Sequence, residues 1–141
     1  MRDSGLERFV AAQDAGGTYA QALRELRAGR KTSHWMWFVF PQLAGLGRSA
    51  AAQAYAIASL TEARDYLAHP VLGSRLRECT AAVLTHADRT AEQVFGGIDS
   101  LKLRSSMTLF ARADPAEPAF TAVLEAFYGG EADERTEQLL G

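Results

Sequence analysis

The sequence predicts a mainly α-helical (all-α) protein, a compact orthogonal array of about six or seven short helices in a single domain over residues 1–141. Two observations favour this fold class. Apolar residues recur three and four positions apart through most of the chain, the spacing of one face of an α-helix. Alternation of the strand type is almost absent, and the one β-prone stretch, residues 37–40, has no partner. A hydrophobic content of 48% over 141 residues suffices for one buried core.

The first two predicted helices form a hairpin before residue 30. Ser4 can cap the first helix, which ends at the glycine pair of residues 16–17, and Thr18 can cap the second. Gly29 is placed to end the second helix in the left-handed conformation. Two short amphipathic helices joined by a tight turn are expected to pack side by side. The residues that share one face are Leu6, Phe9, Val10 and Gln13 in the first helix and Tyr19, Ala22, Leu23 and Leu26 in the second.

Helix-capping patterns place the helices in the middle of the chain. Residues 59–62 have the form of a capping box and open a helix that ends near Ala68. Pro70 suits the first turn of the next helix, because its missing N–H costs little there. Gly73 within that turn is a mild weakness of about 1 kcal/mol relative to alanine. Residues 49–57 are expected to form one further helix.

The last third of the chain carries three more start signals. Residues 90–93 repeat the capping signature and open a brief turn that the glycines 96–97 close. Residues 114–117 combine an N-cap, a proline and a carboxylate, and the helix they open stops at residues 129–130. A last acidic turn begins near Asp133. Between the first two signals lies a helix that is expected to be largely buried through Leu101, Leu103, Met107, Leu109 and Phe110.

Composition excludes several function classes. A formal net charge of −2, with lysines and arginines spread along the chain, argues against duplex nucleic acid as a partner. No run approaches the roughly 20 apolar residues of a membrane span and no apolar signal core follows the N-terminus, so we expect a cytoplasmic protein without a membrane partner. The single cysteine, Cys79, is expected to be a buried hydrophobic side chain. The histidines lack metal-ligand spacing and no phosphate-binding glycine loop is present, so neither a metal nor a cofactor is indicated.

Residues 31–43 stand out because they gather both tryptophans around one histidine. Aromatic rings offer flat faces for a base, and lysine beside a helix start can meet a phosphate. His34 is the candidate catalytic residue, because imidazole exchanges protons near neutral pH. The ligand-binding candidates in this segment are Lys31, Ser33, Trp35, Trp37, Phe40 and Gln42. The alternative is that the segment is a buried central element, or that its aromatics divide between the core and a cleft.

A second candidate segment, residues 99–107, places cations and hydroxyls on an apolar helix. Lys102, Ser105 and Ser106 lie within about one turn of each other, and Arg104 lies on a different face. Such a group invites a phosphate or carboxylate partner, so Lys102, Arg104 and Ser105 complete the predicted ligand-binding set. The alternative is a solvated face on which the cations pair with acidic neighbours.

These blocks together resemble an uncharacterised family, the domain of unknown function 1810, which is sometimes labelled calpastatin-like. The resemblance runs through residues 6–10, 33–43, 45–47, 63–76 and 99–110 and implies a mainly helical fold with no established activity. A weaker likeness, to the superfamily that handles NAD- and ADP-ribose-related nucleotides, comes from residues 72–76 and the lysine-containing helix ending in Met107. Some members of that superfamily remove ADP-ribose from nucleic-acid bases. The aromatic segment here holds no counterpart of their catalytic carboxylate.

Two hypotheses follow. The first is a small-molecule cleft for a nucleotide or an ADP-ribose-type ligand, which could include hydrolysis of an N-glycosidic bond; it predicts that His34 and Lys102 converge on one concave pocket. The second is a non-enzymatic protein-interaction module with the aromatic segment as core. It predicts a continuous exposed apolar patch of several hundred Å², and the protein partner is not identified.

Overall fold

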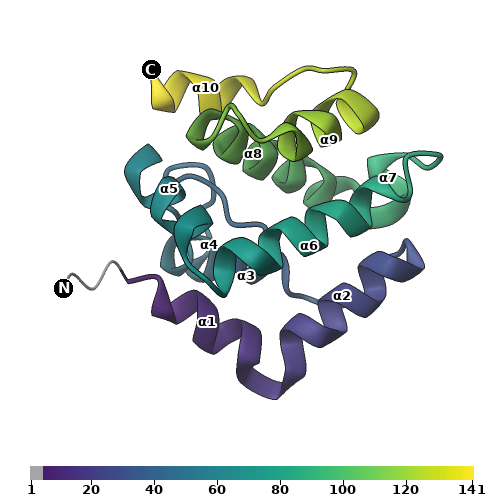
Figure 1. Ribbon diagram of the computed structural model, residues 1–141, viewed down its shortest axis with the longest axis horizontal. Coiled ribbons are helices and arrows are strands. Elements are labelled where there is room, and N and C mark those ends of the chain that lie inside the picture. The colour runs from purple at the N-terminus through teal and green to yellow at the C-terminus, as the bar shows by residue number, and fades with distance from the viewer. Residues whose placement is uncertain (1–4) are drawn as a thin grey trace.

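The computed structural model describes residues 5–141, and these form ten α-helices and one 3₁₀ helix (Figure 1). The mainly α fold class is therefore confirmed. The β-prone residues 37–40 form no strand, because most of them belong to a one-turn helix. The elements are α1 (Glu7–Asp14), η1 (Ala15–Gly17), α2 (Thr18–Ala28), α3 (Met36–Val39), α4 (Ala50–Ala54), α5 (Leu60–Ala68), α6 (Leu72–Leu84), α7 (Ala91–Phe95), α8 (Gly97–Ala113), α9 (Pro118–Tyr128) and α10 (Glu134–Leu140).

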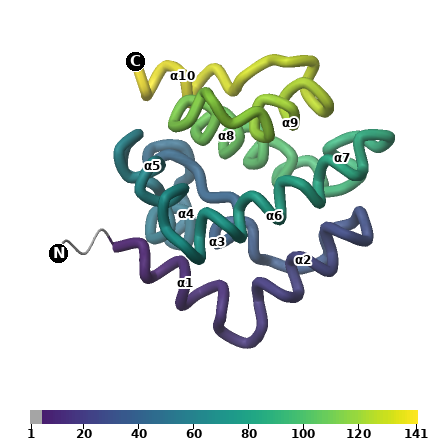
Figure 2. The backbone as a smooth tube through the Cα atoms, in the orientation of Figure 1, coloured from purple at the N-terminus to yellow at the C-terminus, as the bar shows by residue number. Residues whose placement is uncertain are grey.

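Helix α6 crosses the middle of the molecule, between two groups of helices (Figures 1 and 2). Helices α1 and α2 meet at η1 and form a V on one side, whereas α8, α9 and α10 pack together on the other. Helix α6 contacts α2, α5 and α9, and α8 contacts α5, α7 and α9. One hydrophobic cluster joins all of these elements; its largest fully buried side chains include Phe9, Trp35, Phe40, Tyr66, Phe110 and Phe120.

The start of α6 requires glycine at position 73, which corrects the sequence-based view of Gly73 as a weakness. A Cβ atom built there would lie 2.1 Å from the carbonyl oxygen of Leu67, so α5 and α6 approach each other as backbone. Pro70 precedes the helix instead of opening it. His69 caps the helix from outside: its Nδ1 accepts hydrogen bonds from the amides of Val71 (3.1 Å) and Leu72 (3.2 Å).

Other helix boundaries follow the capping chemistry with exceptions. The capping box at Thr90 is confirmed, and Gly29 ends α2 in the left-handed conformation with φ 79°. Thr18 is not the N-cap of α2: left-handed Gly17 takes that place, and the Thr18 hydroxyl donates to the Ala15 carbonyl. Helix α1 has no side-chain cap from its N-cap residue Leu6, and Ser4 lies outside the described residues.

The start predicted at residues 114–117 lies further along, with Glu117 as N-cap and Pro118 as the first helical residue of α9. Starting at Pro115 would place Pro118 in the helix interior, where its ring clashes with the carbonyl of residue 114. Leu101 is 63% exposed although it was expected to be buried. It lies two residues, about 200° of helical rotation, from buried Leu103 and so faces away from the core.

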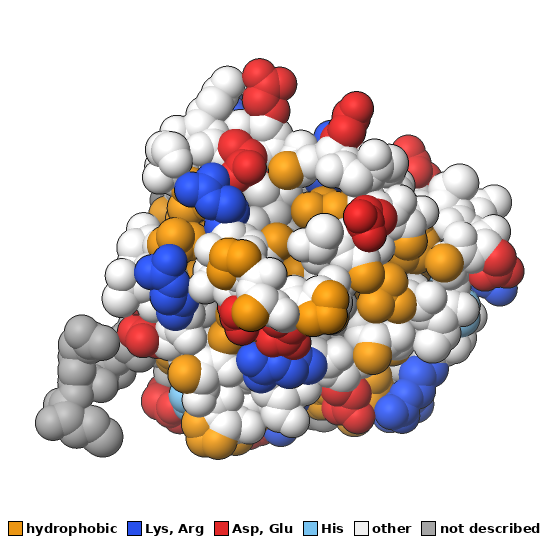
Figure 3. Space-filling model, turned by 45° about the horizontal axis from the view of Figure 1, so that its top comes forward, with side chains coloured by type: hydrophobic (Ala, Val, Ile, Leu, Met, Phe, Trp, Pro, Cys, Tyr) orange, Lys and Arg blue, Asp and Glu red, His pale blue; other side chains and the backbone are white. Residues whose placement is uncertain are grey.

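The surface mixes charges of both signs. On the face drawn in Figure 3, lysine and arginine side chains alternate with aspartate and glutamate, and apolar side chains show between them. Among residues 5–141, no helix is long and apolar enough to cross a membrane.

Candidate functional site

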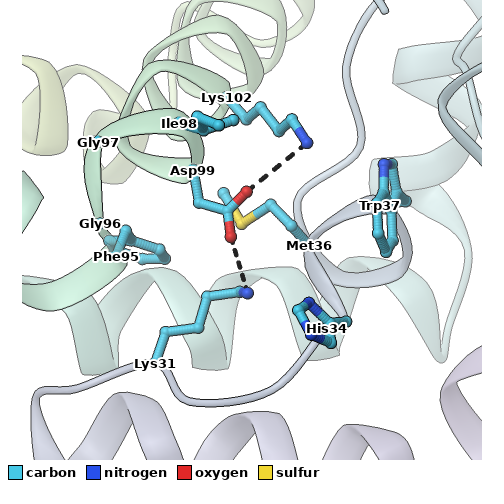
Figure 4. Close-up of a pocket in the computed structure, with 10 residues that line it drawn as sticks. All are labelled: Lys31, His34, Met36, Trp37, Phe95, Gly96, Gly97, Ile98, Asp99 and Lys102. Carbon is cyan, nitrogen blue, oxygen red and sulfur yellow. Dashed lines mark ion pairs between the residues drawn. The ribbon is translucent and has the colours of Figure 1, made fainter. Parts of the chain in front are cut away.

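A pocket of about 400 Å³ opens between two segments that are far apart in the chain (Figure 4). One segment runs from the loop after α2 into α3, and the other runs from the end of α7 into the first turns of α8. The lining residues are Lys31, His34, Met36 and Trp37 from the first segment and Phe95, Gly96, Gly97, Ile98, Asp99 and Lys102 from the second. His34 and Lys102 thus converge on one concave pocket, as the small-molecule hypothesis expects.

A backbone hydrogen bond and an ion pair join the two segments. The amide of Lys31 donates to the carbonyl of Val94 at 2.7 Å, which fixes the first segment to α7. The Lys31 ammonium then reaches the carboxylate of Asp99, with 2.7 Å between Nζ and Oδ2. The Lys102 ammonium lies 3.6 Å from the other carboxylate oxygen, Oδ1. Asp99 therefore lies between two lysines at the centre of the pocket wall (Figure 4).

The two lysines differ in how firmly they are held. The side chain of Lys31 is 6% exposed, its Nζ donates to the Ser33 carbonyl at 2.6 Å, and it lies 5.0 Å from the centroid of the Trp35 ring. The side chain of Lys102 is 25% exposed and lies 5.1 Å from the centroid of the Trp37 ring. Lys31 is thus committed to the protein, whereas Lys102 has the looser contact and can turn towards a ligand.

The first turn of α8 adds backbone donors to the pocket. Gly96 precedes the helix with φ 82° and ψ 168°, a conformation reserved for glycine, and no side chain caps the helix. The first intrahelical bond runs from the Ser100 amide to the Gly96 carbonyl, so the preceding amides of α8 lie at its open end. A Cβ atom at Gly96 or Gly97 would meet nothing within 4 Å, so this end of the helix is free space.

Trp37 forms the wall opposite α8. Its ring is half-buried, and its Nε1 is buried without a hydrogen-bond partner among the described residues. Met36, Trp37 and Lys102 also line a neighbouring cavity of about 10 Å³, which Gln42 and Tyr55 share. That volume is close to what one water molecule requires. A buried N–H without an acceptor is costly, so this wall favours an oxygen atom from a ligand or from water.

His34 is exposed at the pocket mouth. The pocket thus combines one carboxylate, two ammonium groups and an imidazole within an otherwise apolar lining. Donors outnumber acceptors in this set, and the two lysines outweigh the single carboxylate in charge. This balance favours a ligand rich in oxygen acceptors, with at least one hydroxyl for Asp99.

The structure does not bring all predicted site residues to this pocket. Trp35 and Phe40 are 1% exposed and belong to the core, and Ser33 binds Glu25 through its hydroxyl. Gln42 lines the small neighbouring cavity. Arg104 turns away and donates to the Glu131 carbonyl at 2.9 Å, while the buried Ser105 hydroxyl donates to the Leu101 carbonyl. The aromatic segment therefore divides between core and cleft.

Two carboxylates that the sequence did not indicate lie in the pocket or bind the loop that carries its residues. Asp99 stood at the edge of the second candidate segment, three positions before Lys102, and that spacing could have indicated an ion pair. Glu25 gave no local signal, since it lies on α2 well before the aromatic segment. It is nevertheless 6% exposed and binds the segment that carries Lys31 and His34.

Comparison with family models shows one family. The family model described as "Protein of unknown function (DUF1810)" matches residues 3–140. The chain is also similar to a solved structure, the conserved hypothetical protein Rv1873 from Mycobacterium tuberculosis, with 56% identity and a TM-score of 0.92. The alignment covers 96% of this chain and 95% of that one. No curated protein matches the chain.

Proposed function

This chain belongs to the DUF1810 family, and we propose that its pocket binds a small nucleotide or an ADP-ribose-type ligand. The observation that carries the proposal is the placement of Asp99 between Lys31 and Lys102 in a pocket that also holds His34 and Trp37. A sugar phosphate needs this combination of groups: a carboxylate accepts hydrogen bonds from sugar hydroxyls, and an ammonium group neutralises phosphate.

The expected pose follows from which groups are free. Lys102 turns from Asp99 to the phosphate, and the open amides of α8 support the same group. Asp99 keeps its bond to Lys31 and accepts from the sugar hydroxyls. The planar part of the ligand lies against Trp37 and the exposed side chain of Ile98, which is 74% exposed.

Hydrolysis of an N-glycosidic bond is the finer part of the proposal. As the bond between the anomeric carbon and the base nitrogen breaks, positive charge develops on the sugar, and the Asp99 carboxylate would stabilise that charge. His34 would take a proton from the water whose oxygen joins the anomeric carbon, while the base leaves with the bonding electron pair. Nicotinamide leaves NAD as a neutral molecule, and a base that leaves as an anion would take up the proton that His34 holds. Asp99 would thus supply the carboxylate that the aromatic segment lacks.

A thermal-shift screen against AMP, NAD and ADP-ribose tests binding. A ligand at about 100 times its dissociation constant stabilises the fold by about 2.7 kcal/mol, which raises Tm by several degrees. Lys102→Ala and His34→Ala should abolish the shift. Arg104→Ala, on the same helix but outside the pocket, is the matched control and should keep it. A blank screen with folded protein would refute the nucleotide proposal.

Turnover needs a separate measurement. Chromatography of NAD or an ADP-ribosylated nucleoside incubated with the protein would show release of the free base. Asp99→Asn and His34→Ala should remove this activity. Binding without release in the unaltered protein would leave a binding module and exclude hydrolysis of the compounds tested.

The alternative, a protein-interaction module, rests on a different observation. Ile98 and Leu101 are 74% and 63% exposed and lie one turn apart at the start of α8. Two exposed side chains make a small patch, and single exposed apolar residues are common on monomers, which is why the pocket carries the proposal. Light scattering tests the alternative: concentration-dependent association that Ile98→Asp removes would favour it, and a monomer at all concentrations would count against it.

A further inference from the structure

Glu25 is a buried carboxylate that the proposed ligand contacts do not use. It lies on α2, is 6% exposed, and forms no ion pair among residues 5–141. A carboxylate without a cationic partner is costly to bury unless hydrogen bonds satisfy it. Here all the donors but one come from a short stretch of chain, the loop that leads from α2 into α3, and the remaining donor is Gln21 on α2 itself.

Both carboxylate oxygens of Glu25 are occupied. Oε1 accepts from the amides of Thr32 (2.8 Å) and Ser33 (3.0 Å) and from the indole Nε1 of Trp35 (2.8 Å). Oε2 accepts from the Ser33 hydroxyl and from Gln21 Nε2, the latter at 2.7 Å. Burial opposes ionisation, but the hydrogen bonds from these groups outweigh it and hold the pKa of Glu25 far below its usual range.

Along the loop, the residues that donate to Glu25 are interspersed with the residues that line the pocket. Thr32, Ser33 and Trp35 bind Glu25, while Lys31 and His34 on the same stretch reach the pocket. The Lys31 amide is fixed at one end by the carbonyl of Val94. Glu25 fixes the other end, so the direction of the Lys31 and His34 side chains depends on two anchors.

We infer that Glu25 is a positioning residue: by binding residues 32, 33 and 35 it holds Lys31 against Asp99 and His34 at the pocket mouth. The expected effect of Glu25 on ligand affinity rests on the proposed function. The effect of Glu25 on the loop does not depend on any ligand. Glu25 acts through the loop and does not itself line the pocket.

Two substitutions separate geometry from charge. Glu25→Ala removes all acceptors and leaves the Trp35 indole and two amides without partners. Glu25→Gln keeps one acceptor oxygen for Thr32, Ser33 and Trp35. The Ser33 hydroxyl can turn to accept from the new NH2 group, and the Gln21 amide, which now donates at that place, can flip to accept as well. Asp133→Ala is the matched control. Asp133 is the N-cap of α10, where its side chain accepts a hydrogen bond from the Thr136 amide, so its loss lowers stability outside the pocket and does not touch the loop.

The first readout needs no ligand: hydrogen exchange of the Lys31 amide, whose partner is Val94 and not Glu25. Glu25→Ala should speed this exchange by about tenfold or more, whereas Glu25→Gln and Asp133→Ala should leave it near the original rate. The second readout is the ADP-ribose dissociation constant by calorimetry, at a temperature where every variant is folded. Glu25→Ala should weaken binding by about tenfold or more, and Glu25→Gln by about threefold or less.

Unchanged Lys31 exchange in Glu25→Ala would overturn the inference, and so would equal losses in Asp133→Ala and Glu25→Ala. If Glu25→Gln loses as much as Glu25→Ala, the positioning role is wrong and the charge itself matters. If the unaltered protein binds no ADP-ribose, the proposed function fails for that ligand, while the exchange experiment still decides the role of Glu25.

Discussion

The two pocket lysines should respond differently when each is replaced by methionine: one variant should lose stability, and the other should lose ligand binding. Methionine keeps most of the apolar stem and removes the ammonium group, so the loss reports on charge. Lys31→Met should destabilise the fold strongly. Lys102→Met should leave stability almost unchanged and remove the ligand-induced shift.

The magnitude follows from burial and distance. Removing Lys31 leaves the Ser33 carbonyl and the carboxylate of Asp99, whose side chain is 20% exposed, without their closest partner. Breaking a buried pair costs about 3–5 kcal/mol, and we take the lower end because Lys102 can move towards Asp99. For Lys102, with a 3.6 Å contact and a 25% exposed side chain, the loss is at most about 1 kcal/mol.

The assay is urea unfolding of both variants followed by tryptophan fluorescence, with a thermal scan beside it. At about 3–4 °C per kcal/mol, Tm should fall by about 10 °C in Lys31→Met and by about 3 °C or less in Lys102→Met. Equal destabilisation would refute the division of roles between the two lysines. So would a ligand shift that survives in Lys102→Met.

Three further results are expected. Gly73→Ala should lower stability by about 1–2 kcal/mol in urea unfolding, because the clash with the Leu67 carbonyl outweighs a helix-propensity gain of about 1 kcal/mol; a more stable variant would contradict the close approach. Because the pKa of Glu25 is lower in the folded than in the unfolded protein, its ionised carboxylate stabilises the fold above the unfolded pKa of about 4.3, and this stabilisation is lost as pH falls towards the folded pKa. Tm should therefore drop less on acidification in Glu25→Gln than in the unaltered protein, and identical acid profiles would count against this. Burial raises the pKa of the Cys79 thiol to about 12, so a thiol-specific disulfide reagent should label it only after unfolding, and rapid labelling of the folded protein would contradict that placement.

Local chemistry predicted those elements whose causes are local. The capping box at Thr90 and the left-handed end of α2 at Gly29 depend on neighbours within a few residues, so the sequence alone places them. The α9 start was misplaced because two prolines compete and only the later one leaves the helix interior free of proline. Gly73 was misjudged because its reason is a second helix, which no local pattern reveals.

The pocket was predicted in part for the same reason. Residue types in one segment marked His34 and Trp37, and cations on an apolar helix marked Lys102. That Lys31 meets Asp99 is a property of tertiary packing, so the sequence could not distinguish a phosphate-binding lysine from one that is already bound. Trp35 lies in the core and Trp37 at the pocket, and this division depends on the hydrogen bond that the Trp35 indole N–H donates to the Glu25 carboxylate.

The contact between the Lys31 amide and the Val94 carbonyl has a consequence for folding cooperativity. The two walls of the pocket come from opposite halves of the chain, so neither half alone can present the binding groups. A molecule that occupies the pocket therefore opposes global unfolding as well as any local opening that separates the two walls. Protection by a ligand should extend to amides throughout the core, in α6 as much as in α8, and any truncation that removes one wall should abolish recognition together with cooperative unfolding.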